Sequence, residues 1–415
     1  MTATSCSGVQ FTVTPTNGTN GVIPAGTTYT WTTPNVTGGM TGGATGTNAA
    51  TITGTITNPT STAQTATYTV TPKTAAGCTG ATFTVTVTIN PAPSVTAMTA
   101  TICSGVQFTV TPADGTNGII PTGTTYSWSI PSLPTGLTGA AAGTNATTIS
   151  GTITNATSNP LNAIYTITPK ANGCTGATFT ITVTINPAPA ITPMTANICS
   201  GLPFTVTPTN ITNGVVPTGT TYSWSDPILS GGMTGGAPGS GATNISGTLL
   251  NSTNTSQTGI YTVTPLSAAG CTGANFTVTV TVNPAPAVTD MHDTICSGLQ
   301  FTVIPINGTN GVVPTGITYS WPLPTLPSGL TGGAIGTNVT SITGTLTNAT
   351  NNPLTGIYTV TPKANGCTGS PFTLTVTVNP ATAITNMTAT ICSGVPFYSN
   401  PYKWNQRSST GRDNL

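Results

Sequence analysis

The sequence is most unusual in how little charge it carries. Only 3% of its 415 residues are charged, His292 is the only histidine, and glutamate is absent. A Ser–His–Asp triad would have one candidate base, and a glycosidase needs two carboxylates facing each other across a cleft. The net charge of +1 provides no basic surface for nucleic acid or anionic lipid. We therefore predict a non-enzymatic protein with no catalytic residue, no cofactor and no nucleic-acid partner.

Long apolar runs and a signal pattern are also missing. No stretch approaches the roughly 18 apolar residues of a membrane span, so we predict no membrane insertion. The first residues contain neither a basic segment nor an apolar segment typical of a signal peptide. One stretch, TDMHDT at 289–294, places Asp290, His292 and Asp293 together as a conceivable metal site. We favour a solvated linker there and predict no metal.

What the sequence does contain is a long internal repeat. Alternate cysteines lie in CSG contexts and recur every 97, 96, 97 and 96 residues, and the cysteines between them lie in GCTG contexts. A fixed period of about 96 residues fits a whole small domain rather than a solenoid unit. Met1 occupies the position of Met98 and Met194 in this register, so we expect that the natural chain continues upstream. We predict the following domains: repeats at 1–93, 94–189, 190–286 and 287–383, a truncated fifth repeat at 384–397, and an aberrant, disordered tail at 398–415.

Each repeat has the pattern of an antiparallel β-sandwich. In the second repeat, apolar and polar residues alternate over 106–112, 124–129, 147–155, 163–169 and 177–186, rich in Thr, Val, Ile and aromatic residues. Such alternation predicts half-buried strands. With a first strand near 95–102 and a short strand before Ile149, each repeat has about seven strands. The fold class is therefore all-β, with tandem immunoglobulin-like sandwiches. The stiff Asn-Pro-Ala-Pro linkers predict that they form an elongated rod.

The aromatic residues and threonines of each repeat have fixed positions. Phe, Tyr and Trp fall on the strand face that carries the other apolar residues. This placement favours packing between the sheets over a sugar-binding platform. Rows of threonine such as Thr84, Thr86 and Thr88 share one strand face. Such a row could bind ice or carry glycans, but threonine is also a favourable residue for any exposed strand face. We favour this second interpretation.

The cysteines predict structural disulfides. We expect one bond inside each repeat, with free buried thiols as the alternative. Zinc binding is disfavoured because no CxxC spacing is present. Disulfides imply an oxidising compartment, hence an extracellular or cell-surface location. The predicted pairs are Cys6–Cys78, Cys103–Cys174, Cys199–Cys271 and Cys296–Cys367, and Cys392 is predicted to be unpaired.

The motif set carries a family resemblance. The series ICSG, FTVTP, TTYSW, YTVTPK, NGCTG and FTVTVTINPAP resembles the PKD-like tandem domains of large Bacteroidota surface proteins. The resemblance covers residues 1 to about 397. Such domain arrays are similar to those in gliding-motility adhesins and in proteins exported by the type IX secretion system. It implies a secreted stalk or adhesin. The WDFGDG-type signature of true PKD domains is replaced here by sequences such as YSWSIP.

We therefore expect a structural spacer of a bacterial surface adhesin. Surface polysaccharide or another extracellular ligand would bind elsewhere in the parent protein. The alternatives are a multivalent array that binds glycan or ice weakly, and an accessory region of a secreted enzyme.

Overall fold

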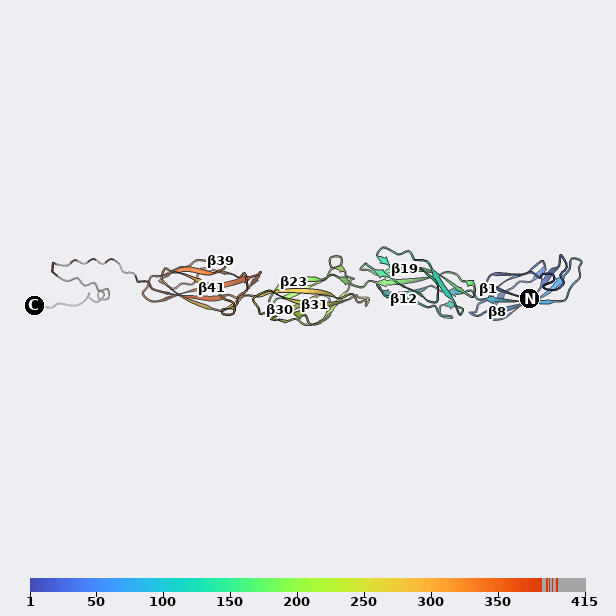
Figure 1. Cartoon of the computed structure of the whole chain (residues 1–415), viewed down its shortest axis with the longest axis horizontal. Coiled ribbons are helices and arrows are strands. Elements are labelled where there is room, and N and C mark those ends of the chain that lie inside the picture. The colour runs from blue at the N-terminus through green and yellow to red at the C-terminus, as the bar shows by residue number, and fades with distance from the viewer. Residues whose placement is uncertain (383–385, 387, 389, 391–392, 395–415) are drawn as a thin grey trace. The chain divides into compact units, whose positions relative to one another are not determined.

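The computed structural model describes residues 1–382, 386, 388, 390 and 393–394 and contains no helix among them. Contacts divide the chain into Met1–Pro284, which holds the first three repeats, and Ala285–Leu415, which holds the fourth. Figure 1 shows each repeat as two layers of strands. Apart from the isolated positions named above, the predicted fifth repeat and tail lie outside the described residues.

The strands have the following bounds in each repeat. Repeat 1 contains β1 (Thr2–Cys6), β2 (Gln10–Val13), β3 (Thr28–Trp31), β4 (Asn35–Val36), β5 (Thr41–Gly42), β6 (Gly46–Ala49), β7 (Ile52–Thr57), β8 (Gln64–Lys73) and β9 (Phe83–Asn90). Repeat 2 contains β10 (Ser94–Val95), β11 (Met98–Cys103), β12 (Gln107–Val110), β13 (Gly118–Ile119), β14 (Thr125–Trp128), β15 (Leu137–Thr138), β16 (Gly143–Ala146), β17 (Ile149–Thr152), β18 (Thr154–Asn155), β19 (Leu161–Ala171), β20 (Cys174–Thr175) and β21 (Phe179–Asn186). Repeat 3 contains β22 (Ala190–Ile191), β23 (Met194–Cys199), β24 (Pro203–Val206), β25 (Gly214–Val215), β26 (Thr221–Trp224), β27 (Ile228–Leu229), β28 (Met233–Gly235), β29 (Gly239–Ala242), β30 (Ile245–Asn251), β31 (Gln257–Leu266) and β32 (Phe276–Asn283). Repeat 4 contains β33 (Ala287–Val288), β34 (Met291–Cys296), β35 (Gln300–Val303), β36 (Gly311–Val312), β37 (Thr318–Trp321), β38 (Leu330–Gly332), β39 (Gly336–Val339), β40 (Ile342–Asn348), β41 (Leu354–Ala364), β42 (Cys367–Thr368) and β43 (Phe372–Asn379).

The topology of each repeat is an immunoglobulin-like sandwich, as predicted. In repeat 2 the larger sheet has the order β11-β21-β19-β14-β16, and β12 with β17 forms the facing layer. The first strand, β11, runs parallel to the last, β21, with Met98 opposite Ile181 and Cys103 opposite Asn186. The predicted strands are present, and the structure adds short ones such as β13, which pairs with the linker strand β10.

The core lies between the two layers and is formed by the predicted alternating residues. In repeat 2, Tyr165, Ile167 and Ile149 are fully buried. The Phe108 ring lies 5.4 Å from the Tyr165 ring. Trp128 donates from Nε1 to the Ala141 carbonyl at 3.0 Å. The interpretation of these aromatic residues as core is therefore confirmed for this repeat.

Buried tyrosines of repeats 1 and 4 make stability depend on pH. Burial raises the pKa of Tyr68, Tyr319 and Tyr358 to about 12 from 10.0. Their hydroxyls have no hydrogen-bond partner among the described residues. The raised pKa contributes stability that is fully present below pH 10 and is lost as the pH rises through about 12. We expect the urea midpoint to fall over that range, with phenolate absorbance of the folded protein rising near pH 12. A phenolate midpoint near 10 in the folded protein would contradict this.

Candidate functional site: the junctions between repeats

Among the described residues, the few titratable side chains do not gather into a site. The Asp290 carboxylate accepts a hydrogen bond from the Thr373 backbone at 2.7 Å, and that of Asp293 accepts one from the Thr294 backbone at 2.8 Å. Across the described part of the chain, no three His, Cys or Asp side chains are placed to hold a metal. None of the described residues forms a helix long and apolar enough to span a membrane.

The disulfides join consecutive repeats. Cys6 of repeat 1 bonds to Cys174 of repeat 2, and Cys103 of repeat 2 bonds to Cys271 of repeat 3. The Cα atoms of the bonded residues are 5.6 and 5.5 Å apart, and both bonds span 168 residues. The predicted pairing within repeats is therefore wrong. Cys78 and Cys296 are exposed free thiols, Cys199 and Cys367 are also disulfide-bonded, and Cys392 lies outside the described residues.

The length of the last strand explains why pairing within a repeat fails. Cys6 lies opposite Asn90, at the end of β9, whereas Cys78 precedes Phe83, where β9 begins. Seven residue steps along a strand separate these two ends by about 23 Å. A disulfide needs Cα atoms about 4.4 to 6.8 Å apart. The first cysteine of a repeat therefore lies at the end of that repeat from which the chain continues into the following repeat. There it meets the second cysteine of the following repeat.

A serine and a buried asparagine fix the chain next to the first cysteine of each repeat. In repeat 2, the Ser104 backbone donates to the Asn186 carbonyl at 2.8 Å, and the Ser104 hydroxyl accepts from the Asn155 backbone at 2.8 Å. Asn155 is 3% exposed, and its side-chain amide donates to the Asn159 and Ile185 carbonyls at 2.8 and 2.9 Å. Its Oδ1 accepts from the backbone and hydroxyl of Thr157. Sequence reasoning missed this asparagine, although its recurrence at the end of TITN, TLLN and TLTN was a visible signal.

Removing the Asn155 side chain should destabilise repeat 2. Asn155→Ala deletes four hydrogen bonds and leaves buried carbonyls without a partner, so we expect a loss of about 2 to 3 kcal/mol. Urea unfolding of the full chain, with hydrogen exchange to localise the change, measures it. Asn162→Ala is the control in the same repeat, because Asn162 is exposed on β19 and its substitution should cost under about 0.5 kcal/mol. Equal effects of the two substitutions would contradict the role assigned to Asn155.

The Asn-Pro-Ala-Pro linker is clamped between two glycines of the repeat that it enters. In repeat 2, Ser94 and Val95 pair with Ile119 and Gly118. A Cβ on Gly118, which has a φ of +124°, would lie 2.0 Å from the Ser94 carbonyl oxygen. A Cβ on Gly176, on the other side, would lie 1.9 Å from the Pro93 carbonyl oxygen. The GCTG motif therefore combines a bonded cysteine with a glycine that lets the linker approach.

The same linker docking recurs in the next two repeats. Ala190 and Ile191 pair with Val215 and Gly214, as Ala287 and Val288 do with Val312 and Gly311. The glycines at the Gly176 position are Gly273 and Gly369, where a Cβ would lie 2.1 and 2.2 Å from a linker proline carbonyl.

Polar side chains add contacts across two junctions. Asn210 of repeat 3 donates to the Ser158 hydroxyl of repeat 2 at 3.0 Å. Asp114 holds the corresponding position in repeat 2 and contacts Ser61 of repeat 1. Hydrogen bonds from the Ile120 backbone, and then from Ser61, lower the pKa of Asp114. The junctions of repeat 1 with repeat 2 and of repeat 2 with repeat 3 are thus held by a covalent bond, a paired linker strand and polar contacts.

Comparison with known proteins gives one family. The PKD-like domain family matches residues 3–93, 100–189, 197–286 and 293–382. No curated protein matches the chain.

Solved structures similar to this chain include the three that follow. The I-band fragment I67-I69 from titin is 9% identical, with 69% of this chain and 97% of that chain covered and a TM-score of 0.30. The human desmocollin-1 ectodomain is 13% identical, with 92% and 80% covered and a TM-score of 0.23. The Drosophila N-cadherin fragment EC1-4 is 11% identical, with 86% and 92% covered and a TM-score of 0.23. On the family match, which covers most of its length, this chain belongs to the PKD-like domain family, whose domain it contains in four consecutive copies.

Proposed function

We propose that the chain is a non-enzymatic, load-bearing stalk segment of a secreted bacterial cell-surface adhesin. The observation that carries this proposal is the pair of overlapping disulfides between consecutive repeats. A chain of β-sandwiches joined only by peptide linkers lengthens when any domain unfolds under tension. Overlapping bonds prevent most of that lengthening.

The two bonds turn one covalent path into three parallel ones. Cys6 and Cys174 become one node, and Cys103 and Cys271 become another. Residues 6–103, 103–174 and 174–271 each connect the two nodes, so a pull across both nodes is shared by three segments. The shortest segment, 103–174, limits the extension to 71 residues, whereas the open chain from 6 to 271 has 265.

The same bonds support the proposed location at the cell surface. Disulfides persist in oxidising compartments, and secreted proteins are the usual place for them. The low charge and the absence of recurring acids support a structural role over an enzymatic one. A ligand of the parent adhesin, such as surface polysaccharide, would then bind outside these repeats.

Single-molecule force spectroscopy tests the proposal. The full chain is pulled between Met1 and a non-thiol handle at position 274, just beyond Cys271. Chemical reduction should add roughly 640 to 700 Å of contour length at full unfolding, because 194 more residues become extensible. Equal contour lengths before and after reduction would reject the load-bearing function.

A further inference from the structure

Repeat 2 has an open edge on its larger sheet. β11 ends the strand order β11-β21-β19-β14-β16, and β21 is its one partner strand among the described residues. The strand has six residues, reads MTATIC and contains neither proline nor a charged residue. An edge of this kind presents unpaired backbone N–H and C=O groups, to which another strand can pair.

The opposite edge of the same sheet is protected. β16 has only four residues, and its pairing with β14 is irregular between Tyr126 and Trp128. Asn145, within β16, has a φ of +51°, in the left-handed region. A short strand with an irregular register is poorly suited to accept a further strand. The two edges of the sheet therefore differ, and β11 is the one open to pairing.

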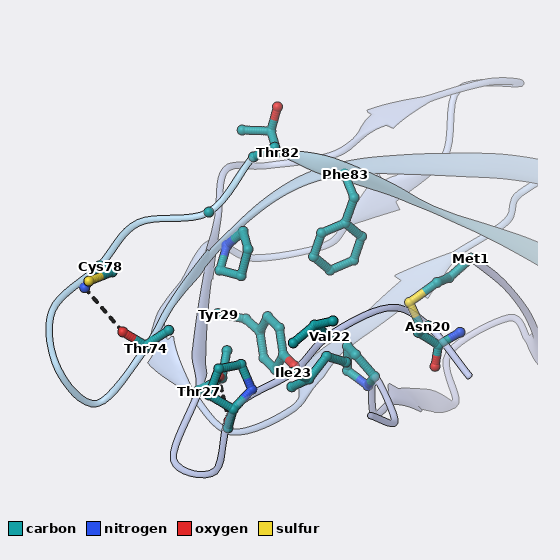
Figure 2. Close-up of a pocket in the computed structure, with 15 residues that line it drawn as sticks. Met1, Asn20, Val22, Ile23, Thr27, Tyr29, Thr74, Cys78, Thr82 and Phe83 are labelled. Carbon is teal, nitrogen blue, oxygen red and sulfur yellow. Dashed lines mark hydrogen bonds between the residues drawn. The ribbon is translucent and has the colours of Figure 1, made fainter. Parts of the chain in front are cut away.

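The first strand of repeat 1 shows which backbone groups of such an edge are already bonded. The Met1 nitrogen donates to the Thr84 carbonyl, and the Met1 carbonyl accepts from the Thr86 backbone, both at 2.9 Å. Figure 2 shows the Met1 side chain at the rim of a pocket that Tyr29 and Phe83 also line. A residue at this position thus directs its backbone groups to the last strand and its side chain to the core.

The same alternation in β11 leaves two threonines free to pair. β11 has the register of β1, so Met98, Ala100 and Ile102 bond to β21. Their side chains are partly buried against the core. The residues between them, Thr99 and Thr101, are exposed, and their N–H and C=O groups point away from β21.

The sequence of β11 is symmetric about Ala100. A threonine lies on each side of this alanine, and the next residues outward, Met98 and Ile102, are both apolar. If a second β11 pairs antiparallel about Ala100, Thr99 lies opposite Thr101 of the other copy, and each such pair exchanges two backbone hydrogen bonds. The two Ala100 residues then face each other with Cα atoms about 4.5 Å apart, where a small side chain fits.

The first strands of the other repeats lack this symmetry. Ser5 replaces the isoleucine in β1. Asn197 replaces the second threonine in β23, where its Oδ1 accepts a hydrogen bond from Asn283 at 3.0 Å. In β34, Asp293 holds the position of Ala100, so two paired copies would bring like charges together. Of these four strands, β11 is the one that suits pairing with itself.

We propose that β11 is a self-association surface, at which the β11 strands of two copies pair antiparallel and join two larger sheets into one. The occupant is a second copy because the symmetry of the strand matches a two-fold contact, in which the same surface serves both partners. The low charge of the chain, 3% of its residues, leaves little repulsion between copies. The inference goes beyond the proposed function, since one chain can bear load whether or not copies pair.

Sedimentation equilibrium of the full chain tests the proposal. The chain carries Cys78→Ser, Cys296→Ser and Cys392→Ser, so that copies cannot join through these thiols. We expect a monomer–dimer equilibrium with a dissociation constant on the order of 10⁻⁴ M, because a single pair of strands is a small interface.

Two variants with the same added charge show whether β11 forms the contact. Ala100→Asp should raise the dissociation constant at least tenfold, because like charges then face each other. Repeat 4 accepts an aspartate at this position, since Asp293 lies opposite Val376 in the same register. Thr144→Asp is the matched control on the opposite edge, where Thr144 is exposed on β16, and should leave the constant unchanged.

Hydrogen exchange without the Asp substitutions locates the contact. The Thr99 and Thr101 amides point to solvent in a single copy and are bonded in the pair. Their exchange should slow about fivefold at about 1 mM, where this dissociation constant pairs about four-fifths of the chains. The amides of His292 and Thr294, at the matching positions of β34, should exchange at a rate independent of concentration.

The proposal fails if the chain remains monomeric at about 1 mM. It also fails if Ala100→Asp and Thr144→Asp weaken the dimer equally, because the contact would then not depend on β11. A dimer in which the slowed amides lie on another strand would likewise place the interface elsewhere.

Discussion

Gly176→Ala is expected to release the linker from repeat 2 and to cost about 3 to 5 kcal/mol of its stability. The new Cβ would lie 1.9 Å from the Pro93 oxygen and 2.8 Å from its carbonyl carbon. Both are backbone atoms of a linker held between β13 and the Cys174 disulfide, so neither can move aside by a change of rotamer. The strain is therefore relieved only by displacing the linker or the GCTG loop.

Hydrogen exchange on the full chain measures this effect locally. The Thr96 amide bonds to the Asn117 carbonyl at 2.9 Å, and its exchange should accelerate by at least a hundredfold in the variant. Urea unfolding gives the accompanying loss of stability.

Gly80→Ala is the matched control in repeat 1. Both glycine amides donate to a proline carbonyl at 2.9 Å, Gly80 to Pro72 and Gly176 to Pro169. A Cβ at either position meets the ring of that same proline, but only at Gly176 does a linker carbonyl approach. We expect Gly80→Ala to change stability by less than about 1 kcal/mol. If the two substitutions lower the stability equally, the turn itself requires the glycine at this position. The role assigned to Gly176 in holding the linker would then be wrong.

The fold of one repeat could be predicted because its signals are local. Alternation along FTITVTIN places Phe179, Ile181 and Val183 on one face, and the structure buries all three. The same alternation of apolar and polar residues predicted that Trp128 and Tyr165 face the core. Strand periodicity acts over neighbouring residues, so a single sequence reveals it.

The pairing of the cysteines could not be read in the same way. Cys6 and Cys78 share a repeat, and proximity in sequence favoured a bond between them. The parallel pairing of β1 with β9 decides otherwise, because it carries Cys6 to the far end of the strand that begins after Cys78. Parallel register is a long-range property that alternation does not encode. The linker clamp escaped prediction for a related reason, since the approach of Pro93 to Gly176 depends on how one repeat follows another.

Removing one inter-repeat disulfide is expected to change the extensible length very little, and removing both should change it greatly. The chain is again pulled between Met1 and position 274. With Cys6→Ser and Cys174→Ser, the shortest path from residue 6 to residue 271 runs along 6–103 and then crosses the Cys103–Cys271 bond. With Cys103→Ser and Cys271→Ser, it crosses the Cys6–Cys174 bond and then runs along 174–271.

Both single-bond variants therefore have a limiting path of 97 residues, against 71 with both bonds closed. The gain is 26 residues, or roughly 90 Å, and the two variants should give the same value. The variant without either bond gains 194 residues, or roughly 640 to 700 Å. The gain in contour length on removing both bonds should be more than three times the sum of the gains of the two single-bond variants. If the gain without either bond only equals that sum, the overlapping network is wrong. When one disulfide between repeats is lost, the other thus still limits the extension of the chain. A stalk built this way tolerates the loss of one disulfide.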